Sequence, residues 1–264
     1  MDLQLGNKQA LVTGSTAGIG LAIASALAKE GADVIINGRT EERVRSAVGR
    51  IQKETGGAKV RGVAADLGTP DGASRMAAAV PDVDILVNNL GIFEAKEFAA
   101  ITDEDWMHMF EVNVLSGVRL CRHCFPRMLE QNWGRIVFIS SESGLNTPAE
   151  MIHYGVTKTA QLALARGLAE MTVATNVTVN SVLPGPTRSE GVGQFVQNLA
   201  SSRGVSAQQF EADFFKSARP SSLLRRFETP EEIAALVAFV VSPLASGING
   251  AALRVEGGVV RSIA

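Results

Sequence analysis

Tyr154 and Lys158 stand four positions apart, a spacing that places both side chains on one face of a helix. An ammonium group beside a phenol favours the phenolate, so we expect Lys158 to pull the pKa of Tyr154 down from about 10 towards neutrality. A phenol tuned in this way can exchange a proton with an alcohol or carbonyl oxygen. A lone pair of this spacing is also common in purely structural helices. Tyr154 is the only tyrosine of the chain, so its ionisation can be followed without interference.

Ser141 lies where a hydroxyl could join this pair. It follows the apolar run Ile136–Ile139, which predicts a strand, and the carboxyl ends of parallel strands form the ligand-binding edge of a doubly wound sheet. Ser140 and Ser143 compete for the same role. No G-x-S-x-G elbow surrounds these serines, so serine hydrolase chemistry is a poor fit.

Asn113 sits on an apolar stripe that repeats every three or four residues from Thr102 to Met128 and predicts one long helix with a buried face. An amide is costly to bury without partners, so Asn113 is either a packing amide satisfied by a backbone carbonyl or a member of the site. Cys121 and Cys124 lie on the same stripe, and we interpret them as core thiols. We expect His153 at a pocket rim or on the surface.

A glycine-rich turn separates the first apolar strand from an amphipathic run over Leu21–Glu30. Glycines let the backbone approach a pyrophosphate, and the N–H groups at a helix start supply hydrogen bonds and the positive end of the dipole. No Gly-Lys-Ser/Thr follows, so the turn is not a P-loop. It therefore predicts a dinucleotide site, with a plain strand-to-helix turn as the alternative. The candidate ligands are Gly14, Ser15, Thr16, Gly18, Ile19 and Gly20.

Apolar segments recur along the chain with room for a helix between each pair, which predicts βαβ alternation. The segments are almost continuously apolar, so helices should cover both faces of the sheet. We predict an α/β fold, a doubly wound parallel (Rossmann) sheet of about seven strands, in a single domain over residues 1–264. Residues 190–220 are expected to insert short helices, a substrate lid, before the last strand. The predicted strands are Ala10–Val12, Val34–Ile36, Val60–Ala64, Ile85–Val87, Ile136–Ile139, Val177–Val182 and Ala251–Val255.

The composition excludes several classes of protein. Of 264 residues, 46% are hydrophobic and 20% are charged, the ordinary balance of a globular protein. With 25 Lys and Arg against 27 Asp and Glu, the net charge of −2 offers no field for nucleic acid or an anionic membrane. Two cysteines and a start without a signal peptide favour the cytoplasm, and the longest apolar run, Ile233–Val241, is too short to span a bilayer. No cluster has metal-ligand spacing, so we expect no metal.

The motifs in their order give the chain a resemblance to a known family. The glycine-rich turn, Asn88-Asn89-Leu90-Gly91, Asn113, Ser141, the Tyr154 and Lys158 pair, and Pro184-Gly185 together resemble the short-chain dehydrogenase/reductase family over essentially the full length. The resemblance implies an oxidoreductase that moves hydride between a nicotinamide cofactor and a carbonyl or secondary alcohol. Reductases of ketones and of 3-oxoacyl thioesters are the most similar members in general pattern. The alternatives are an NAD-dependent alcohol, sugar or steroid dehydrogenase and a non-catalytic dinucleotide-binding regulatory protein.

The resemblance also implies a role for each motif. Tyr154 would give or take the proton, Lys158 would lower its pKa and hold the nicotinamide ribose, and Ser141 would fix the substrate oxygen. Asn113 would order a water that connects Lys158 to solvent. A further pair, Asp66 and Leu67, would contact the adenine, or would simply form a strand-end turn. The remaining cofactor contacts implied by the family are Asn88, Gly91, Pro184, Gly185, Thr187 and Ser189.

The choice between the two nicotinamide cofactors depends on the end of the second strand. An NAD site needs a carboxylate there for the ribose 2′-hydroxyl, but Gly38 stands where the family's Asp would fall, and Arg39 follows. A guanidinium can pair with a 2′-phosphate. We therefore expect NADP(H) to be preferred over NAD(H), the other interpretation of Arg39 being a solvated surface charge. Ala17, where many NADP-using relatives carry a basic residue, points to modest discrimination.

The segment expected to bind substrate carries few motifs. Several apolar residues favour a small apolar carbonyl or alcohol substrate, although each could equally belong to the core, and a group of three phenylalanines could face the substrate or pack on the core. By resemblance, the chain should form homodimers or homotetramers. The apolar candidates are Leu90, Phe93, Leu145, Met151 and Phe195, and the phenylalanines are Phe210, Phe214 and Phe215.

Overall fold

Seven parallel strands form one sheet in the order β3-β2-β1-β4-β5-β6-β7. The computed structural model describes residues 1–189 and 206–263. Each strand lies within two residues of its predicted bounds, which confirms the doubly wound α/β fold. The strands are β1 Gln9–Val12, β2 Asp33–Gly38, β3 Val60–Ala64, β4 Ile85–Asn88, β5 Gly134–Ile139, β6 Val177–Pro184 and β7 Ala252–Val255.

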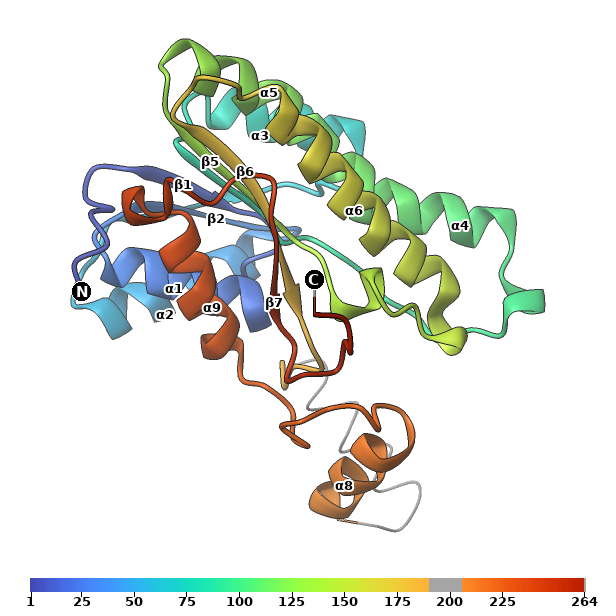
Figure 1. The fold of residues 1–264 in the computed structure, drawn as a ribbon. Helices are drawn as coiled ribbons and strands as arrows, with labels where there is room; N and C mark the ends of the chain where they lie inside the picture. The colour runs from blue at the N-terminus through green and yellow to red at the C-terminus, as the bar shows by residue number, and fades with distance from the viewer. Residues whose placement is uncertain (190–205, 264) are drawn as a thin grey trace.

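Helices cover both faces of the sheet (Figure 1). On one face lie α1, α2 and α9, and on the other lie α3, α5 and α6, while α8 stands apart near the end of β6. The helices are α1 Gly18–Lys29, α2 Glu41–Thr55, α3 Pro70–Ala79, α4 Asp103–Phe110, α5 Ser116–Glu130, α6 Ile152–Glu170, α8 Ala207–Ser217 and α9 Pro230–Val240. Short 3-10 turns span Phe98–Ala100, Glu142–Gly144, Ala149–Met151 and Pro243–Ala245. Within the described residues, no helix is long and apolar enough to cross a membrane.

The core forms two clusters, one on each face of the sheet. On β1, Ala10 and Val12 pack with α1 and α9, whereas Leu11 between them packs on the opposite face with α5. Successive strand residues point to opposite faces, so a strand covered on both sides is apolar at every position. Cys121 and Cys124 are free, buried thiols in the second cluster, as predicted.

Two helix starts follow the sequence signals. The backbone N–H of Thr229 donates to Oε2 of Glu232 at 2.8 Å, one half of the capping box expected before α9. Before α8, Oγ of Ser206 accepts from the N–H of Gln209 at 3.1 Å. The phenylalanines of α8 pack with Phe227 in a small cluster of their own. The rest of the predicted lid, residues 190–205 with Phe195, lies outside the described residues.

The long helix predicted from Thr102 to Met128 is not regular. Its extent is right, but a wider π-helical turn over Glu111–Leu115 separates α4 from α5. Asn113 stands in the middle of this turn and is 2% exposed. A π turn of this kind often marks a functional site, because the extra residue displaces side chains and carbonyls from their regular positions. The three- and four-residue repeat of apolar residues cannot reveal such a turn.

The strand order reverses between β1 and β4. On either side of that point, the connections leave the sheet in opposite directions, so a crevice opens beyond the carboxyl ends of these strands. The glycine-rich turn follows β1, and Asn89 to Gly91 follow β4. Two of the predicted motifs therefore meet at the place where a doubly wound sheet binds ligands.

Candidate active site

The glycine-rich turn has the backbone shape of a phosphate cradle. Gly14 and Gly18 take φ values of 58° and 56°, in the left-handed region that favours glycine. At Gly20, a Cβ would collide with the side chain of Asn89 and the carbonyl oxygen of Gly14. At the start of α1, Ala17 offers no side-chain cap and the first turn holds no acidic residue. The free N–H groups and the dipole of α1 thus fit an anionic pyrophosphate.

Two asparagines hold this turn from either side. Oδ1 of Asn37, on β2, accepts from the N–H of Gly14 at 3.1 Å. Nδ2 of Asn89, after β4, donates to the carbonyl oxygens of Thr13 at 2.8 Å and Gly14 at 3.1 Å. Ser15 is fully buried, and its hydroxyl donates to Val12 and accepts from the N–H of Asn37. Its side chain therefore shapes the turn rather than facing a phosphate.

The structure separates the two neighbouring asparagines after β4. Asn88, the residue chosen from the sequence, is buried, with Nδ2 3.6 Å from Sγ of Cys121 on α5. Asn89, which the sequence analysis did not select, lines the pocket described below and holds the glycine-rich turn. The alternation of a strand explains the difference, since adjacent side chains point to opposite faces.

The end of β2 presents Arg39 to solvent. Arg39 is exposed and makes no hydrogen bond or ion pair with the residues the structure describes. Gly38 is buried against Thr16, and a Cβ there would collide with the methyl group of that threonine. With Thr16 in this position, an Asp or Glu side chain would not fit at position 38. A free guanidinium next to the glycine-rich turn is available for a phosphate group.

At the end of β3, Asp66 and Leu67 differ in their surroundings. Asp66 is exposed, and its Oδ1 accepts from the N–H of Gly68 at 3.1 Å. Leu67 is 1% exposed and belongs to the core cluster around α5. These contacts are those of the strand-end turn that the sequence left as the alternative, and an adenine contact for either residue stays a prediction.

Ser141 and Tyr154 meet at the carboxyl end of β5. Both side chains line the same cavity, and Ser141 lies close enough to the phenol to oppose the rise in its pKa. Oγ of Ser141 accepts from the N–H of Ser143 at 3.1 Å. The two competing serines are engaged elsewhere, because the Ser140 hydroxyl donates to the carbonyl of Lys158 and the Ser143 hydroxyl donates to Glu142. Of the three serines, Ser141 is the one that the structure places against the phenol.

The pKa values of Tyr154 and Lys158 shift in opposite directions. Burial raises the pKa of Tyr154 to about 12, and Ser141 opposes the rise. Burial lowers the pKa of Lys158 to about 7. Lys158 Nζ lies over the tyrosine ring, 5.5 Å from its centroid. These shifts run against the expected lowering of the Tyr154 pKa by Lys158, which stays a prediction for the site with its ligands bound.

Lys158 is tied to the π turn through a residue that the sequence analysis missed. Its Nζ donates to the carbonyl oxygen of Ile139 at 2.9 Å and to Oε1 of Gln161 at 3.3 Å. Nε2 of Gln161 then donates to the backbone carbonyl of Asn113 at 2.6 Å. Gln161 is 1% exposed. The available signal was its place three residues after Lys158, which puts both on one helix face.

The side chain of Asn113 is fully hydrogen-bonded within the protein. Oδ1 accepts from the N–H of Ile92 at 2.8 Å, and Nδ2 donates to the Ile92 carbonyl and to Oγ1 of Thr157, both at 3.0 Å. Asn113 thereby fixes the segment after β4 to α6. These contacts agree with a packing amide, and a water relay at Asn113 stays a prediction. Gly91 lies close by, since a Cβ there would stand 3.4 Å from Nζ of Lys158.

The turn after β6 completes the wall opposite Tyr154. The N–H of Gly185 donates to the carbonyl of Val255 and to Oε2 of Glu228, and the Thr187 hydroxyl donates to the Gly185 carbonyl at 2.9 Å. Burial raises the pKa of Glu228 to about 7. Ser189 lies against the glycine-rich turn, because a Cβ on Gly18 would stand 3.1 Å from its own.

A cavity of about 320 Å³ joins these parts. Several aromatic side chains line it, and Glu142 and Arg219 form an ion pair at 2.9 Å on its wall. Burial raises the pKa of Glu142, and Arg219 opposes the rise. The predicted residues that line the cavity are Ile19, Gly91, Phe93, Ser141, Met151, Tyr154, Lys158, Pro184, Gly185, Thr187, Ser189, Phe210 and Phe214.

His153 differs from its prediction. It is 0% exposed, and its ring packs edge-on against Trp106 with 5.9 Å between centroids. Neither ring nitrogen has a hydrogen-bond partner among residues 1–189 and 206–263. Adjacent helical residues point about 100° apart, so the neighbour of a pocket residue can face the core.

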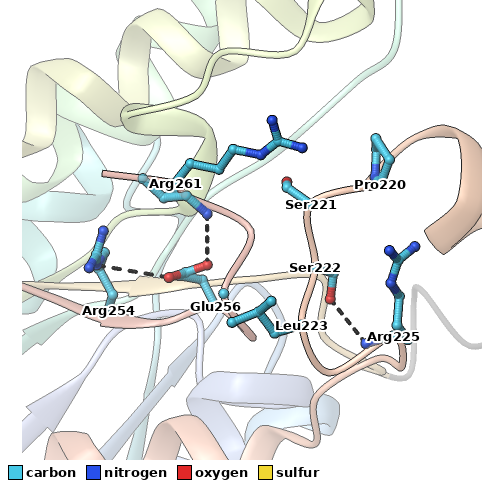
Figure 2. A pocket seen from close by; sticks show the side chains of 10 residues that line it. Pro220, Ser221, Ser222, Leu223, Arg225, Arg254, Glu256 and Arg261 are labelled. Carbon is cyan, nitrogen blue, oxygen red and sulfur yellow. Dashed lines mark hydrogen bonds and ion pairs between the residues drawn. The ribbon is translucent and has the colours of Figure 1, made fainter. Parts of the chain in front are cut away.

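A second, larger cavity of about 620 Å³ lies elsewhere. Figure 2 shows that its lining comes from two segments, the loop 220–225 and the C-terminal stretch 254–261. It contains none of the candidate residues and no phenol. Cavity size alone would therefore select a place without the proton-transfer group, and the smaller cavity around Tyr154 is the candidate active site.

Comparison with known proteins gives one family. Residues 8–200 match the family described as short chain dehydrogenase. The uncharacterized oxidoreductase YvaG of Bacillus subtilis (strain 168) is 51% identical over 263 residues and 100% of both chains. The 3-oxoacyl-[acyl-carrier-protein] reductase FabG of Aquifex aeolicus (strain VF5) is 34% identical, over 98% of this chain and 100% of the relative.

A solved structure agrees with these sequences over the whole fold. L-Sorbose reductase from Gluconobacter frateurii, complexed with NADPH and L-sorbose, superposes with a TM-score of 0.93 at 30% identity and covers 100% of each chain. The chain therefore belongs to the short-chain dehydrogenase/reductase family. It is an oxidoreductase of that family, which acts on alcohol or carbonyl groups.

Proposed function

We propose that this oxidoreductase uses NADPH to reduce a ketone to a secondary alcohol. The observation that carries the proposal is the placement of Ser141 and Tyr154 together in the wall of a cavity that Lys158 also lines. A hydroxyl and a phenol side by side can hold a carbonyl oxygen and protonate it. A regulatory protein that only bound dinucleotide would have no need of this arrangement.

The nicotinamide, when bound, supplies the hydride that reaches the carbonyl carbon. The side chains of the protein hold the carbonyl oxygen and supply the proton. Ser141 donates a hydrogen bond to the carbonyl oxygen, and Tyr154 transfers its hydroxyl proton to that oxygen as the alcohol forms. Lys158, held by Ile139 and Gln161, stands below the phenol ring and can return a proton to it from solvent. One hydride and one proton convert the ketone to the alcohol.

The protonated phenol is the form that reduction needs. With its pKa raised to about 12, Tyr154 holds its proton at cellular pH and can give it to the carbonyl oxygen. The same group accepts the proton when the reaction runs in reverse. The choice of a reductase over an NAD-dependent alcohol, sugar or steroid dehydrogenase therefore depends on the cofactor.

The preference for NADPH rests on Arg39 and Gly38. Arg39 is exposed without a described partner, and Gly38 is packed against Thr16. A 2′-phosphate would meet a free guanidinium here, whereas an NAD site would need a carboxylate. The L-sorbose reductase of similar fold is complexed with NADPH, which supports the same choice. The glycine-rich turn, Asn89, Gly91 and the turn from Pro184 to Ser189 are the proposed cofactor contacts.

Replacing Tyr154 with Phe tests the proposal directly. The variant keeps the ring but has no proton to give, so we expect reduction of ketones with NADPH to fall at least about 100-fold. NADPH affinity, measured by nicotinamide fluorescence, should stay within a few-fold of the wild type. Turnover that survives in Tyr154→Phe would refute the role of the phenol.

A further inference from the structure

Glu142 places a carboxylate in the wall of the Tyr154 cavity, one residue after Ser141. Its side chain is 4% exposed. Oε1 accepts from Nε of Arg219 at 2.9 Å and from the Ser143 hydroxyl at 3.3 Å. Oε2 is closed to solvent and has no hydrogen-bond partner among residues 1–189 and 206–263, so a ligand in the cavity reaches it through a rotation of the carboxylate. A buried polar atom left unpaired costs free energy, and such atoms gather where a ligand completes the network.

Arg219 reaches the same wall from the segment after α8, and its side chain is 11% exposed. Its Nε is used by Glu142, and its Nη1 donates to the carbonyl of Ala218 at 2.9 Å and lies 3.6 Å from Oε1 of Glu150. In the part of the chain that the structure describes, Nη2 has no partner. The ion pair is therefore made through one oxygen and one nitrogen, where a bidentate pair would use two of each.

The spare acceptor on Glu142 and the spare donor on Arg219 belong to groups of opposite charge. A carboxylate on the substrate would be repelled by Glu142, and an ammonium group would be repelled by Arg219. A hydroxyl group can donate to the carboxylate and accept from the guanidinium at the same time. The pair thus selects a neutral group that is both donor and acceptor.

We propose that Glu142 and Arg219 bind a hydroxyl group of the substrate, so that the ketone reduced is a hydroxyketone. The inference rests on the proposed function, since it takes Ser141 as the residue that holds the carbonyl oxygen. Ser141 and Glu142 line the same cavity, so we expect the hydroxyl close to the carbonyl, on the next carbon or one carbon further, and the two ketone pairs of the test distinguish these positions. Phe93 and Phe214 also line the cavity and can contact the carbon chain.

The test compares ketones in which only a hydroxyl is exchanged for a methyl group. One pair is 1-hydroxybutan-2-one and pentan-3-one, and the other is 4-hydroxybutan-2-one and pentan-2-one. Each is reduced with NADPH, and the readout is the ratio of kcat/KM within a pair. We expect the wild type to favour the hydroxyketone of at least one pair by about tenfold or more, as a hydrogen bond to a charged group allows.

Three variants then test whether Glu142 causes the preference for the hydroxyketone. Glu142→Leu should bring it close to one, and Glu142→Gln, which can still accept, should leave an intermediate ratio. Glu130→Gln, exposed at the end of α5, should leave it unchanged. NADPH affinity serves as the check on folding for each variant. The readout is a ratio, so a general loss of activity does not imitate the effect.

Two results would overturn the inference. If the wild type reduces both members of each pair equally well, or prefers the methyl analogues, the cavity does not recognise a hydroxyl and only this inference fails. The same holds if the preference survives in Glu142→Leu. If NADPH binds but none of the four ketones is reduced, the proposed function fails and the inference falls with it.

Discussion

Lys158 lies over the face of the Tyr154 ring, with Nζ 5.5 Å from the ring centroid, and no hydrogen bond joins the two side chains. The lysine instead uses its donors on the Ile139 carbonyl and on Gln161. Lys158 is 4% exposed, whereas Tyr154 is half-buried and lines the cavity. Desolvation penalises the phenolate and the ammonium alike. Each of the two groups therefore has a shifted titration that can be measured.

The ionisation of Tyr154 should appear as a single ultraviolet step near pH 12. Because Lys158 is neutral well below that pH, Lys158→Met should leave the step in place. The measurement is a rapid pH jump read before unfolding, and the denatured chain should show the ordinary phenol pKa of about 10. A native step below 10 that rises in Lys158→Met would mean that the lysine does activate the phenol.

The free energy of unfolding should rise with pH between about 7 and 10.5. In this window the unfolded chain keeps the Lys158 proton and the folded chain has lost it, so the unfolded state binds more protons and stability increases with pH. The contribution has a slope of at most about 1.4 kcal/mol per pH unit. Urea unfolding at several pH values measures it, and Lys158→Met should flatten the curve. An unchanged slope in the variant would place the Lys158 pKa near its ordinary value.

Arg39→Ala should weaken the binding of NADPH and spare that of NADH. Loss of a charge-assisted contact to the 2′-phosphate corresponds to about 1.5–3 kcal/mol, or roughly 10- to 100-fold in Kd. Nicotinamide fluorescence titrations give both constants, and Arg45→Ala, exposed on α2, is the control. Equal losses for both cofactors, or a wild-type preference for NADH, would remove Arg39 from the phosphate site and move the substrate search to alcohol oxidation.

Gln161 should act on Lys158 as a positioning residue, and its variants should show this in the pH profile. Gln161→Leu removes the hydrogen bond to the Asn113 carbonyl, at a cost of about 0.5–1.5 kcal/mol in unfolding free energy. Gln161→Glu brings a carboxylate to the amine and should raise the Lys158 pKa, so the limb of the kcat/KM profile that reports Lys158 should move to higher pH. A profile that is identical in both variants and in the wild type would leave Gln161 a purely structural role.

Strand positions and the serine next to the phenol could be predicted from the sequence because they depend on local pattern. An apolar run between turn residues is enough to place β5. The end of that run leaves Ser140, Ser141 and Ser143 as candidates, and the family resemblance selects Ser141. The widened turn at Asn113 could not be predicted in this way, since one inserted residue leaves the apolar spacing of α4 and α5 almost unchanged. A π turn of this kind depends on how the helix packs against the neighbouring elements.

The sequence also does not show which of two adjacent residues faces the site. Asn88 and Asn89 have the same side chain, and His153 and Tyr154 are neighbours, yet in each pair one member faces the site and the other the core. The rise in the Tyr154 pKa could not be predicted for a related reason, because spacing shows that a lysine is close but does not show how strongly desolvation penalises each charged form.

The two asparagines that hold the glycine-rich turn come from opposite flanks of β1, Asn37 on β2 and Asn89 after β4. The turn therefore receives its shape from the sheet itself, and its conformational entropy is lost when the protein folds. A dinucleotide therefore binds a preorganised site, and none of its binding free energy is used to order the loop. Cofactor affinity and global stability become linked quantities here, so that a substitution at either asparagine would weaken both together.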